Sequence, residues 1–262
     1  MKNMDAVISS SAVIDFDRIG LTYGDRAIIS DLSLTIRRGE IVCVIGPSGC
    51  GKTTALRMAG GLVRPNGGTV RFMGQPLTAP RRDVAIVFQD YGKALLPWRT
   101  AASNVSLALE AAGTPRAERA DRSHALLAKV GLAGHEHKYP TEMSGGMQQR
   151  IQIARCLAQE PSVLLMDEPF GALDAMTRQG LQDEMLALVA ETGTTVLFVT
   201  HDLEEAVYLG DRVIGLLPRP GRIGIELNVD LPRPRNQLET REMPEFLRLR
   251  RALFDFIERA EQ

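Results

Sequence analysis

The chain has 262 residues, a formal net charge of −1 and 44% hydrophobic residues. This length fits one large domain or two small ones with a substantial core. The near-neutral charge argues against a dedicated nucleic-acid binder, whose basic surface would show in the composition.

No apolar stretch approaches the roughly 20 residues that span a bilayer. Residues 1–11 are too weakly apolar for a signal peptide. We therefore expect a cytoplasmic protein that reaches a membrane only through a partner.

The first part of the chain alternates apolar and polar residues in two runs, 13–19 and 32–36, with a turn at Gly24 and Asp25. Such alternation is typical of antiparallel strands with one side in water. A short, β-rich apolar run at 41–45 then predicts a buried parallel strand, and 52–59 predicts a helix.

A phosphate-binding loop joins this strand to this helix. Its sequence is Gly46-Pro47-Ser48-Gly49-Cys50-Gly51-Lys52-Thr53. Glycines let backbone N–H groups converge on phosphate oxygens, and the helix N-terminus favours an anion. Lys52 is expected to reach the β- and γ-phosphates, and the Thr53 hydroxyl is placed to bind Mg²⁺. Because the flanking strand and helix are present, nucleotide binding is favoured over a chance Gly-rich turn.

The three cysteines form no C-x-x-C pair and no ligand cluster with the scattered histidines. Reduced thiols are therefore favoured over disulfides or a zinc site. Cys50 lies in the phosphate loop, where a helix N-terminus can lower the pKa of a thiol, although a filler residue at a permissive position is the favoured interpretation. Alkylation of Cys50 should block nucleotide binding.

Strands are predicted next at 69–73 and 84–88, and helical patterns replace them at 101–112, 116–130 and 146–158. Pro115 suits the first turn of the second of these helices. Strands return at 163–166 and 195–199, separated by a helix near 173–191. This alternation predicts parallel strands joined by right-handed crossovers, with a helical insertion at 90–159.

The C-terminal part predicts a strand at 223–229 and a helix at 244–260. The helix carries apolar residues at helical spacing: Phe246, Leu249, Leu253, Phe256 and Ile257. This spacing favours an amphipathic helix docked on the core over a regulatory one.

Two carboxylates, Asp167 and Glu168, end the apolar run 163–166. Residues at this end of a strand lie in the crevice where α/β sheets bind ligands. Asp167 is suited to hold Mg²⁺ through water, and Glu168 to polarise an attacking water. A solvated acidic pair is the alternative for an isolated motif, but the phosphate loop favours the catalytic interpretation.

Further short motifs follow in a characteristic order. With them, the chain resembles the ATP-binding subunits of ABC transporters over nearly its whole length. The family's signature is matched by Ser144-Gly145-Gly146-Met147-Gln148-Gln149-Arg150, with Met143 where Leu is usual. Four single residues match other motifs of the family. They are the Q-loop glutamine Gln89, the D-loop aspartate Asp174, the switch histidine His201 and the adenine-stacking aromatic Tyr23.

The resemblance implies an α/β fold: a P-loop NTPase (RecA-like) core with an N-terminal antiparallel β subdomain and an α-helical insertion subdomain. We expect one ABC-type ATP-binding domain over 1–262. The β subdomain and RecA-like core would take 12–89 and 160–230, the helical subdomain 90–159, and a C-terminal helical tail 231–262.

The resemblance also implies an ATPase whose cofactors are ATP and Mg²⁺. The catalytic residues are expected to be Glu168, His201 and Gln89, and the residues that bind the metal ion Thr53, Gln89 and Asp167. The nucleotide contacts are expected from Tyr23, Gly46, Pro47, Ser48, Gly49, Cys50, Gly51, Lys52, Thr53, Thr54, Ser144, Gly145, Gly146, Gln148 and Asp174.

The family's mechanism implies a second copy of the chain as a partner. In a head-to-tail dimer, the helix N-terminus at Ser144, Gly145 and Gly146 would face the γ-phosphate bound by the other copy. Hydrolysis would remove that charge and release the dimer.

Residues 90–100 with 104–105, and residues 218–223 with 229–235, resemble the nitrate, sulfonate and taurine group of importers. The resemblance implies transmembrane permease subunits as partners, an indirect link to a periplasmic or extracellular solute-binding protein, no nucleic acid, and a peripheral location on the cytoplasmic face of the inner or plasma membrane. Residues 91–99 are expected to receive the permease, although Leu95 and Trp98 fit internal packing equally well. The solute stays open among nitrate, alkanesulfonates, taurine and a pyrimidine-like precursor. The alternative function is a soluble ABC-type ATPase that acts on a non-membrane partner.

Overall fold

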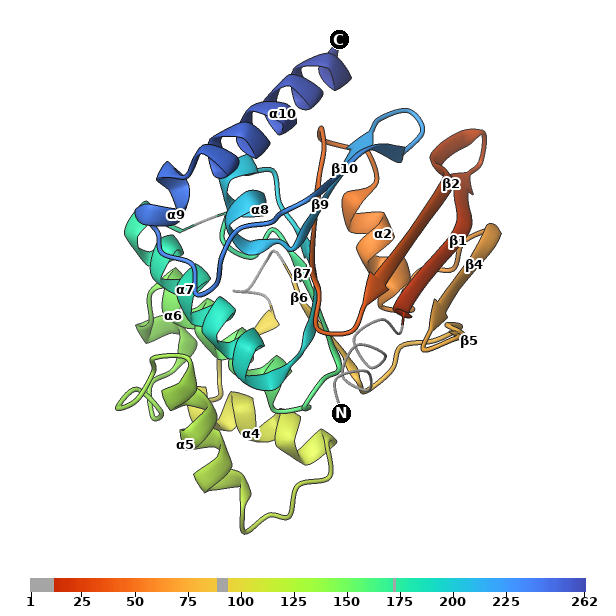
Figure 1. The fold of residues 1–262 in the computed structure, drawn as a ribbon. Coiled ribbons are helices and arrows are strands. Elements are labelled where there is room, and N and C mark those ends of the chain that lie inside the picture. The colour runs from red at the N-terminus through yellow and green to blue at the C-terminus, as the bar shows by residue number, and fades with distance from the viewer. Residues whose placement is uncertain (1–11, 89–93, 172) are drawn as a thin grey trace, which may run out of the picture. The chain divides into compact units, whose positions relative to one another are not determined.

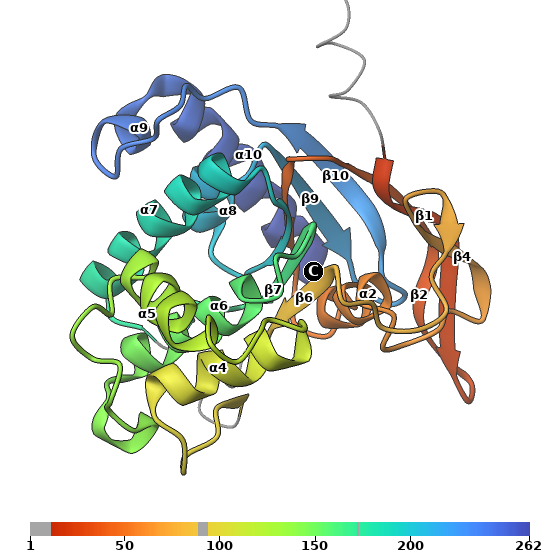
Figure 2. The same cartoon turned by 90° about the horizontal axis from the view of Figure 1, so that it is seen from below.

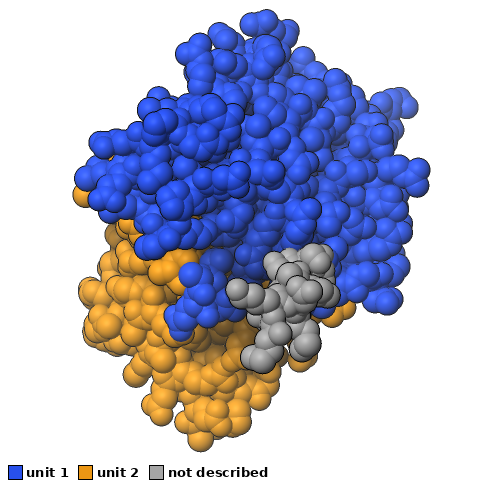
Figure 3. All heavy atoms as spheres, in the orientation of Figure 1, with its two compact units in different colours: residues 1–80, 189–262 blue, residues 81–188 orange. Residues whose placement is uncertain are grey.

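The computed structural model describes residues 12–88, 94–171 and 173–262 (Figure 1). The chain forms two compact units, which Figure 3 colours separately. Unit 1 comprises Met1–Pro80 and Val189–Gln262, and unit 2 comprises Arg81–Leu188. The finer division into subdomains stays a prediction.

Unit 1 contains an antiparallel sheet in the order β2-β1-β4-β5. Its strands are β1 (Ala12–Tyr23), β2 (Arg26–Arg37), β4 (Gly67–Phe72) and β5 (Gln75–Pro76). Residues along β1 and β2 alternate between buried and exposed, which is the pattern of a sheet with one face in the core. The turn between them contains Gly24 at φ 54°, a backbone conformation that glycine adopts without strain. The two strands predicted from alternation are confirmed.

Unit 1 also contains four strands in the order β10-β9-β3-β8. They are β3 (Ile41–Ile45), β8 (Thr195–Val199), β9 (Arg212–Leu217) and β10 (Arg222–Asn228). β3 pairs in parallel with both β8 and β9, while β10 is antiparallel to β9. Every residue of β3 and β8 is buried, which explains why their sequences are apolar without alternation.

Helix α2 (Lys52–Ala59) lies between these two sheets (Figures 1 and 2). Phe16 of β1, Leu56 of α2 and Val44 of β3 line one interior space together with Leu197 and Ile214. Both sheets therefore share one core, and the phosphate loop that precedes α2 is anchored to it.

Among its described residues, unit 1 also contains the helices α8 (Leu203–Leu209), α9 (Glu239–Glu242) and α10 (Pro244–Glu261). Phe246, Leu249, Leu253 and Phe256 of α10 are buried, which confirms the predicted docked amphipathic helix. No helix within the described ranges is both long and apolar enough to cross a bilayer.

Unit 2 pairs two parallel strands, β6 (Val84–Val87) and β7 (Val163–Asp167). The helices of this part are α4 (Ala101–Ala111), α5 (Arg119–Lys129), the short 3₁₀ helix η1 (Pro140–Glu142), α6 (Gly145–Leu157) and α7 (Ala175–Thr192), of which α7 ends beyond the boundary of the unit. The predicted helices at 101–112 and 146–158 are confirmed within one residue at each end.

One predicted helix start is wrong. Pro115 lies in a turn closed by the hydrogen bond from Glu118 N to Pro115 O, at 3.0 Å, and α5 begins only at Arg119. Glu118 N pairs with Pro115 O rather than with Thr114 O, and Arg119 Nε donates to the Thr114 carbonyl at 2.8 Å, so these residues make a turn and not the first turn of the helix. Neither α8 nor β9 was predicted from the sequence.

Candidate functional site

The phosphate loop is shaped by glycine backbone conformations that other residues rarely adopt. Gly46 has φ 150° and Gly51 has φ 99°. A Cβ at Gly46 would lie 2.7 Å from Leu216 O, and one at Gly51 would lie 3.0 Å from Cγ1 of Ile29. Glycine therefore suits both positions, because the backbone conformation and the neighbouring atoms disfavour a side chain there, and a glycine-rich backbone of this kind is what a phosphate cradle requires.

Lys52 begins α2 and points back over this loop. Its Nζ donates to Gly46 O at 2.7 Å and to Pro47 O at 3.1 Å, and the residue is 8% exposed. A buried ammonium is costly unless it is hydrogen-bonded. The loop therefore holds the cation in place where an anionic phosphate chain would meet it.

The loop is supported from behind by the hairpin of β9 and β10. The backbone of Gly221 pairs with that of β2: Gly221 N donates to Ile28 O at 2.8 Å, and Ser30 N donates to Gly221 O at 3.0 Å. A Cβ at Gly221 would lie 2.2 Å from Cys50 O. Gly221 is thus a supporting residue of the phosphate loop that sequence reasoning missed, because the contact joins positions far apart in the chain.

The predicted effect on Cys50 is wrong in direction. Burial raises the pKa of the Cys50 thiol, and the nearby Lys52 offsets this only in part. The side chain is fully buried, so desolvation of the thiolate outweighs the attraction of the helix N-terminus. Cys43 and Cys156 are buried free thiols as well, and burial raises the pKa of Cys156 to about 12.

His201 lies at the same edge of the sheet as the phosphate loop. β3 and β8 are parallel neighbours, with Val44 opposite Val199, so the residues after each strand leave the sheet side by side. Gly46 follows β3 and His201 follows β8. Unit 1 thereby brings together two of the predicted site elements.

Tyr23 ends β1 opposite Arg26 of β2 and is 59% exposed. An exposed aromatic ring at the rim of a sheet is available for stacking. Its contact with adenine stays a prediction.

In unit 2, Asp167 is the last residue of β7 and is 7% exposed. Glu168 follows at φ 46°, a backbone conformation that is rare for a non-glycine residue. Strained backbone of this kind is concentrated at functional sites, where the surrounding structure holds it. The buried strand end therefore presents two carboxylates in fixed positions.

The signature residues form the N-terminus of α6. Ser144 is the N-cap, and its Oγ accepts a hydrogen bond from Met147 N at 3.3 Å. A Cβ at Gly146 would lie 2.7 Å from Cγ2 of Thr177 in α7, so glycine is required there by space. Gln148 Nε2 donates to the carbonyls of Pro140 and Met143, at 2.9 and 3.2 Å, and so ties α6 to the preceding turn.

Two further polar residues have structural partners in unit 2. Asp174 caps α7 by accepting from Thr177 N at 3.0 Å, and hydrogen bonds from Thr177 lower its pKa. Gln149 of α6 is 1% exposed and its Nε2 donates to the carbonyl of Pro169, the residue after Glu168. Gln149 thus supports the turn of Glu168, a role that its place in the signature does not reveal. Gln89 lies outside the described residues.

The comparisons with known proteins agree with this geometry. Residues 29–171 match the family described as "ABC transporter". The nitrate import ATP-binding protein NrtD of Synechococcus elongatus is 41% identical, over 98% of this chain and 97% of the relative. The aliphatic sulfonates import ATP-binding protein SsuB 2 of Burkholderia cenocepacia is 47% identical, over 91% of this chain and 86% of the relative.

Solved structures give the same picture. The dimeric, post-hydrolysis ATP-binding cassette MJ0796, bound to ADP and phosphate, has a TM-score of 0.72 and 33% identity over 82% of this chain and 98% of the cassette. CbiO1 of Clostridium perfringens, part of an ABC transporter complex, has a TM-score of 0.77 and 26% identity over 84% of this chain and 89% of its own.

Proposed function

Because the chain belongs to the ABC transporter family as an ATP-hydrolysing cassette, we propose that it is the energy-coupling subunit of an importer for a small oxyanion. One observation carries the proposal: the nitrate import relative aligns over 98% of this chain, which includes most or all of the C-terminal tail. Together with the sulfonate import relative, this defines a proposed solute class of nitrate, sulfonates and chemically similar solutes such as taurine. The names of both relatives favour an importer over a soluble ATPase with a non-membrane partner.

Nucleotide binding would use the phosphate loop of unit 1. The positive-φ glycines and the buried Lys52 ammonium fit a polyphosphate chain, because the loop already gathers backbone donors and a fixed cation. Tyr23 would stack on adenine, and Thr54 would place its backbone N–H at the start of α2.

A magnesium ion would be held by oxygen ligands from Thr53, Asp167 and Gln89. The Thr53 hydroxyl and the Asp167 carboxylate, which lies at a buried strand end, are oxygen ligands of the kind that Mg²⁺ takes. When bound, the ion would neutralise charge on the phosphates.

Hydrolysis would depend on Glu168 and His201. Glu168 would accept a proton from the attacking water, and its backbone at φ 46° keeps the carboxylate at the end of β7. His201 would contact the γ-phosphate. The protein's contribution is positioning and electrostatics, as in phosphoryl transfer generally.

Two copies would bind ATP between them. Ser144, Gly145 and Gly146 form the first turn of α6, whose helix dipole favours the γ-phosphate bound by the partner copy. Asp174 would lie near the same partner. The dimeric state of the MJ0796 cassette supports this arrangement.

The permease would dock on unit 2. Leu95 is 2% exposed and packs internally, whereas Trp98 is 71% exposed. Asn104 of α4 holds the intervening segment by hydrogen bonds to the backbone of Leu96, Arg99 and Thr100, at 3.0–3.1 Å. An exposed tryptophan on a fixed segment is a typical anchor for a partner.

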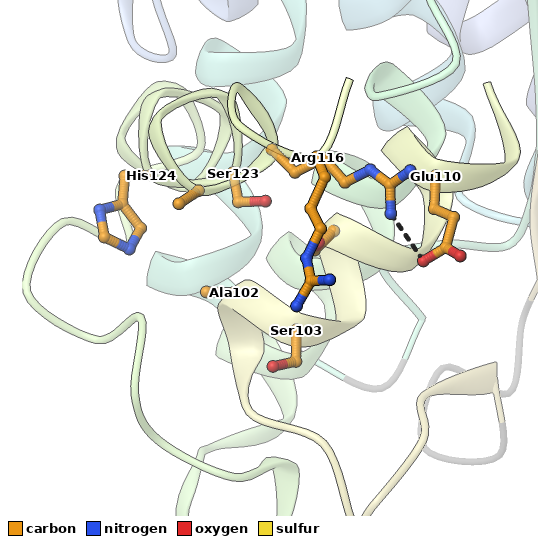
Figure 4. A pocket seen from close by; sticks show the side chains of 9 residues that line it. Ala102, Ser103, Glu110, Arg116, Ser123 and His124 are labelled. Atoms are coloured by element: carbon orange, nitrogen blue, oxygen red, sulfur yellow. Dashed lines mark ion pairs between the residues drawn. The ribbon is translucent and has the colours of Figure 1, made fainter. Parts of the chain in front are cut away.

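The two helices that follow this segment in the chain, α4 and α5, form a groove of about 710 Å³ (Figure 4). Ser103 and Arg116 line it, and Arg119 pairs with Glu110 across it at 2.9 Å. The fully buried Ser123 Oγ lies in its wall and has no hydrogen-bond partner among the residues that the structure describes. The lining of the groove begins at Ala102, four residues after Trp98 in the chain, so a permease segment would find polar contacts in the groove as well as the exposed tryptophan.

Uptake measurements test the solute. A strain that lacks the chain would be complemented with the parent or with Lys52→Ala, and assayed for uptake of nitrate, an alkanesulfonate and taurine. We expect the parent alone to restore uptake of at least one of them. If the parent co-purifies without any multi-spanning protein and restores none of the three, the alternative function is favoured instead.

A further inference from the structure

The C-terminal tail, residues 231–262, contacts the helix that follows His201. α8 starts at Leu203, two residues after His201. In both views, α9 and α10 of the tail lie near α8 within unit 1 (Figures 1 and 2). The helix that the tail contacts therefore begins two residues after a proposed catalytic residue.

Two tail arginines bind one carboxylate of α8. Glu204 Oε2 accepts from Arg241 Nη1 at 2.8 Å, and Glu204 Oε1 accepts from Arg250 Nη1 at 2.8 Å. We call these three residues the arginine clamp. Each carboxylate oxygen has its own cation, and Glu204 lies in the first turn of α8, where the helix dipole favours an acidic side chain.

Aromatic contacts fix one side of the arginine clamp. The Arg241 guanidinium lies 5.0 Å from the ring centroid of Tyr208 in α8 and 5.8 Å from that of Phe246 in α10. The Arg241 side chain is only 20% exposed, so water screens these contacts less than it would on an open surface. Charge and aromatic contacts together join α8 to the tail.

The tail also holds the other end of α8. Arg235 Nη1 donates to the carbonyl of Tyr208 at 2.5 Å, and Arg233 Nη2 donates to that of Leu209 at 3.4 Å. Cations at a helix C-terminus satisfy its last carbonyls and complement its dipole. Arginines of the tail therefore bind both ends of this short helix.

The first turn of α8 is linked directly to the residues on either side of His201. Asp202 Oδ1 accepts from the backbone N–H of Glu204 at 2.9 Å. Thr200 Oγ1 accepts from Asp202 N at 3.0 Å and donates to the buried carboxylate of Glu205 at 2.5 Å. Movement of this turn would therefore move the segment 200–202.

The docking of α10 does not depend on the arginine clamp alone. Phe256 fills a space left by two glycines, since a Cβ at Gly215 or Gly224 would lie 2.5 or 2.7 Å from its ring. Phe246, Leu249 and Leu253 are buried beside it along the same helix. Loss of the clamp should leave the tail on the core.

We propose that the arginine clamp positions His201, with Arg241 and Arg250 acting as positioning residues through Glu204. The inference rests on the proposed contact of His201 with the γ-phosphate. Because the phosphate loop and Tyr23 lie on other elements, the arginine clamp should govern turnover and leave ATP affinity unchanged.

The experiment combines kinetics with hydrogen–deuterium exchange on the full chain. In Arg241→Ala/Arg250→Ala, we expect kcat for ATP hydrolysis to fall about three- to tenfold, the combined effect of losing two partly exposed ion pairs and a cation–π contact. The KM for ATP should stay within about twofold. Backbone exchange in residues 200–209 should become faster, while exchange in β1 and β2 stays the same. Adding Glu204→Gln to the double variant should lower kcat no further, because its partners are already gone.

Arg251→Ala is the matched control, because Arg251 pairs at 3.0 Å with Asp255 of the same helix and does not reach α8. It should match the parent in kcat and in exchange. Unchanged exchange in 200–209 of the double variant would overturn the clamp. Faster exchange with unchanged kcat would refute the effect of the arginine clamp on catalysis. If His201→Ala then also hydrolysed ATP at the parental rate, the failure would lie in the proposed role of His201.

Discussion

At the scale of single residues, the phosphate loop depends on space that side chains would remove. Gly46 and Gly51 leave room for Leu216 O and the Ile29 side chain, which pack against the loop, and Gly221 leaves room for the carbonyl of Cys50. Lys52 then fixes a positive charge over the loop carbonyls at 2.7 and 3.1 Å. Both features fit an anion, and a loop that is held in one shape lowers the cost of binding.

Gly221→Ala should weaken ATP binding although Gly221 lies outside the phosphate loop. The new methyl group would lie 2.2 Å from a backbone oxygen, so Cys50 or the hairpin must move. We expect a loss of about 1–3 kcal/mol of stability, the usual cost of overpacking, and a higher Kd for ATP in a calorimetric titration.

Gly180→Ala serves as the control, because a Cβ at this exposed position of α7 would meet nothing within 4 Å. It should leave the Kd unchanged and stabilise the helix by about 0.5–1 kcal/mol. Equal ATP affinity in the two variants would contradict the supporting role of Gly221.

Lys52→Ala should abolish measurable nucleotide binding, since it removes the cation that faces the β- and γ-phosphates. Tyr23→Ala should weaken binding only mildly, because one aromatic stacking contact contributes about 0.5–1.5 kcal/mol. Titration with a fluorescent ATP analogue ranks the two variants. A larger loss in Tyr23→Ala would show that the ring is more than a secondary contact.

At the scale of elements, the segment before α4 contains one buried side chain, Leu95, and one exposed side chain, Trp98. Replacing Leu96 and Trp98 with Ser should spare ATP binding, because Asn104 holds the segment through its backbone. It should release the subunit from membranes and abolish uptake if these side chains hold the permease. Membrane association in cells and ATP binding by the purified variant are measured together.

Leu95→Ser is the contrasting variant, because Leu95 is buried. It should lose stability by about 2–5 kcal/mol and so lose both properties. Normal uptake and membrane association in the Leu96/Trp98 variant would refute docking through this segment.

Elements with strong local patterns could be predicted from the sequence, and those that depend on distant contacts could not. The strand Ile41–Ile45 and the helix Lys52–Ala59 have the predicted bounds, because an unbroken apolar run and a glycine-rich turn define them locally. β9 was missed because Gly215 interrupts its apolar run. That glycine makes room for Phe256, which follows 41 residues later, so its reason is visible only in the folded chain.

The candidate site shows the same division. The order of the motifs along the chain predicts roles for Lys52, Asp167 and Glu168. The motifs did not reveal that Gln149 binds the turn after Glu168 or that Arg241 and Arg250 hold α8, because both depend on pairings between separate elements. Burial of Cys50 was likewise not readable from its position in the loop, and burial reversed the expected pKa shift.

At the scale of the whole molecule, catalysis and assembly are expected to be linked through the γ-phosphate. The N-terminus of α6 attracts that charge in the partner copy, so the dimer should last as long as ATP remains intact.

Glu168→Gln keeps the shape of the side chain but removes the base, and the buried end of β7 that carries it stays unchanged. We therefore expect this variant to bind ATP, to hydrolyse it at least about a hundredfold more slowly, and to accumulate as a dimer. Size-exclusion chromatography with and without ATP measures the assembly, and phosphate release measures hydrolysis. Lys52→Ala is the control, since it should stay monomeric with ATP. A Glu168→Gln variant that remains monomeric and hydrolyses ATP at the parental rate would remove Glu168 from the catalytic role.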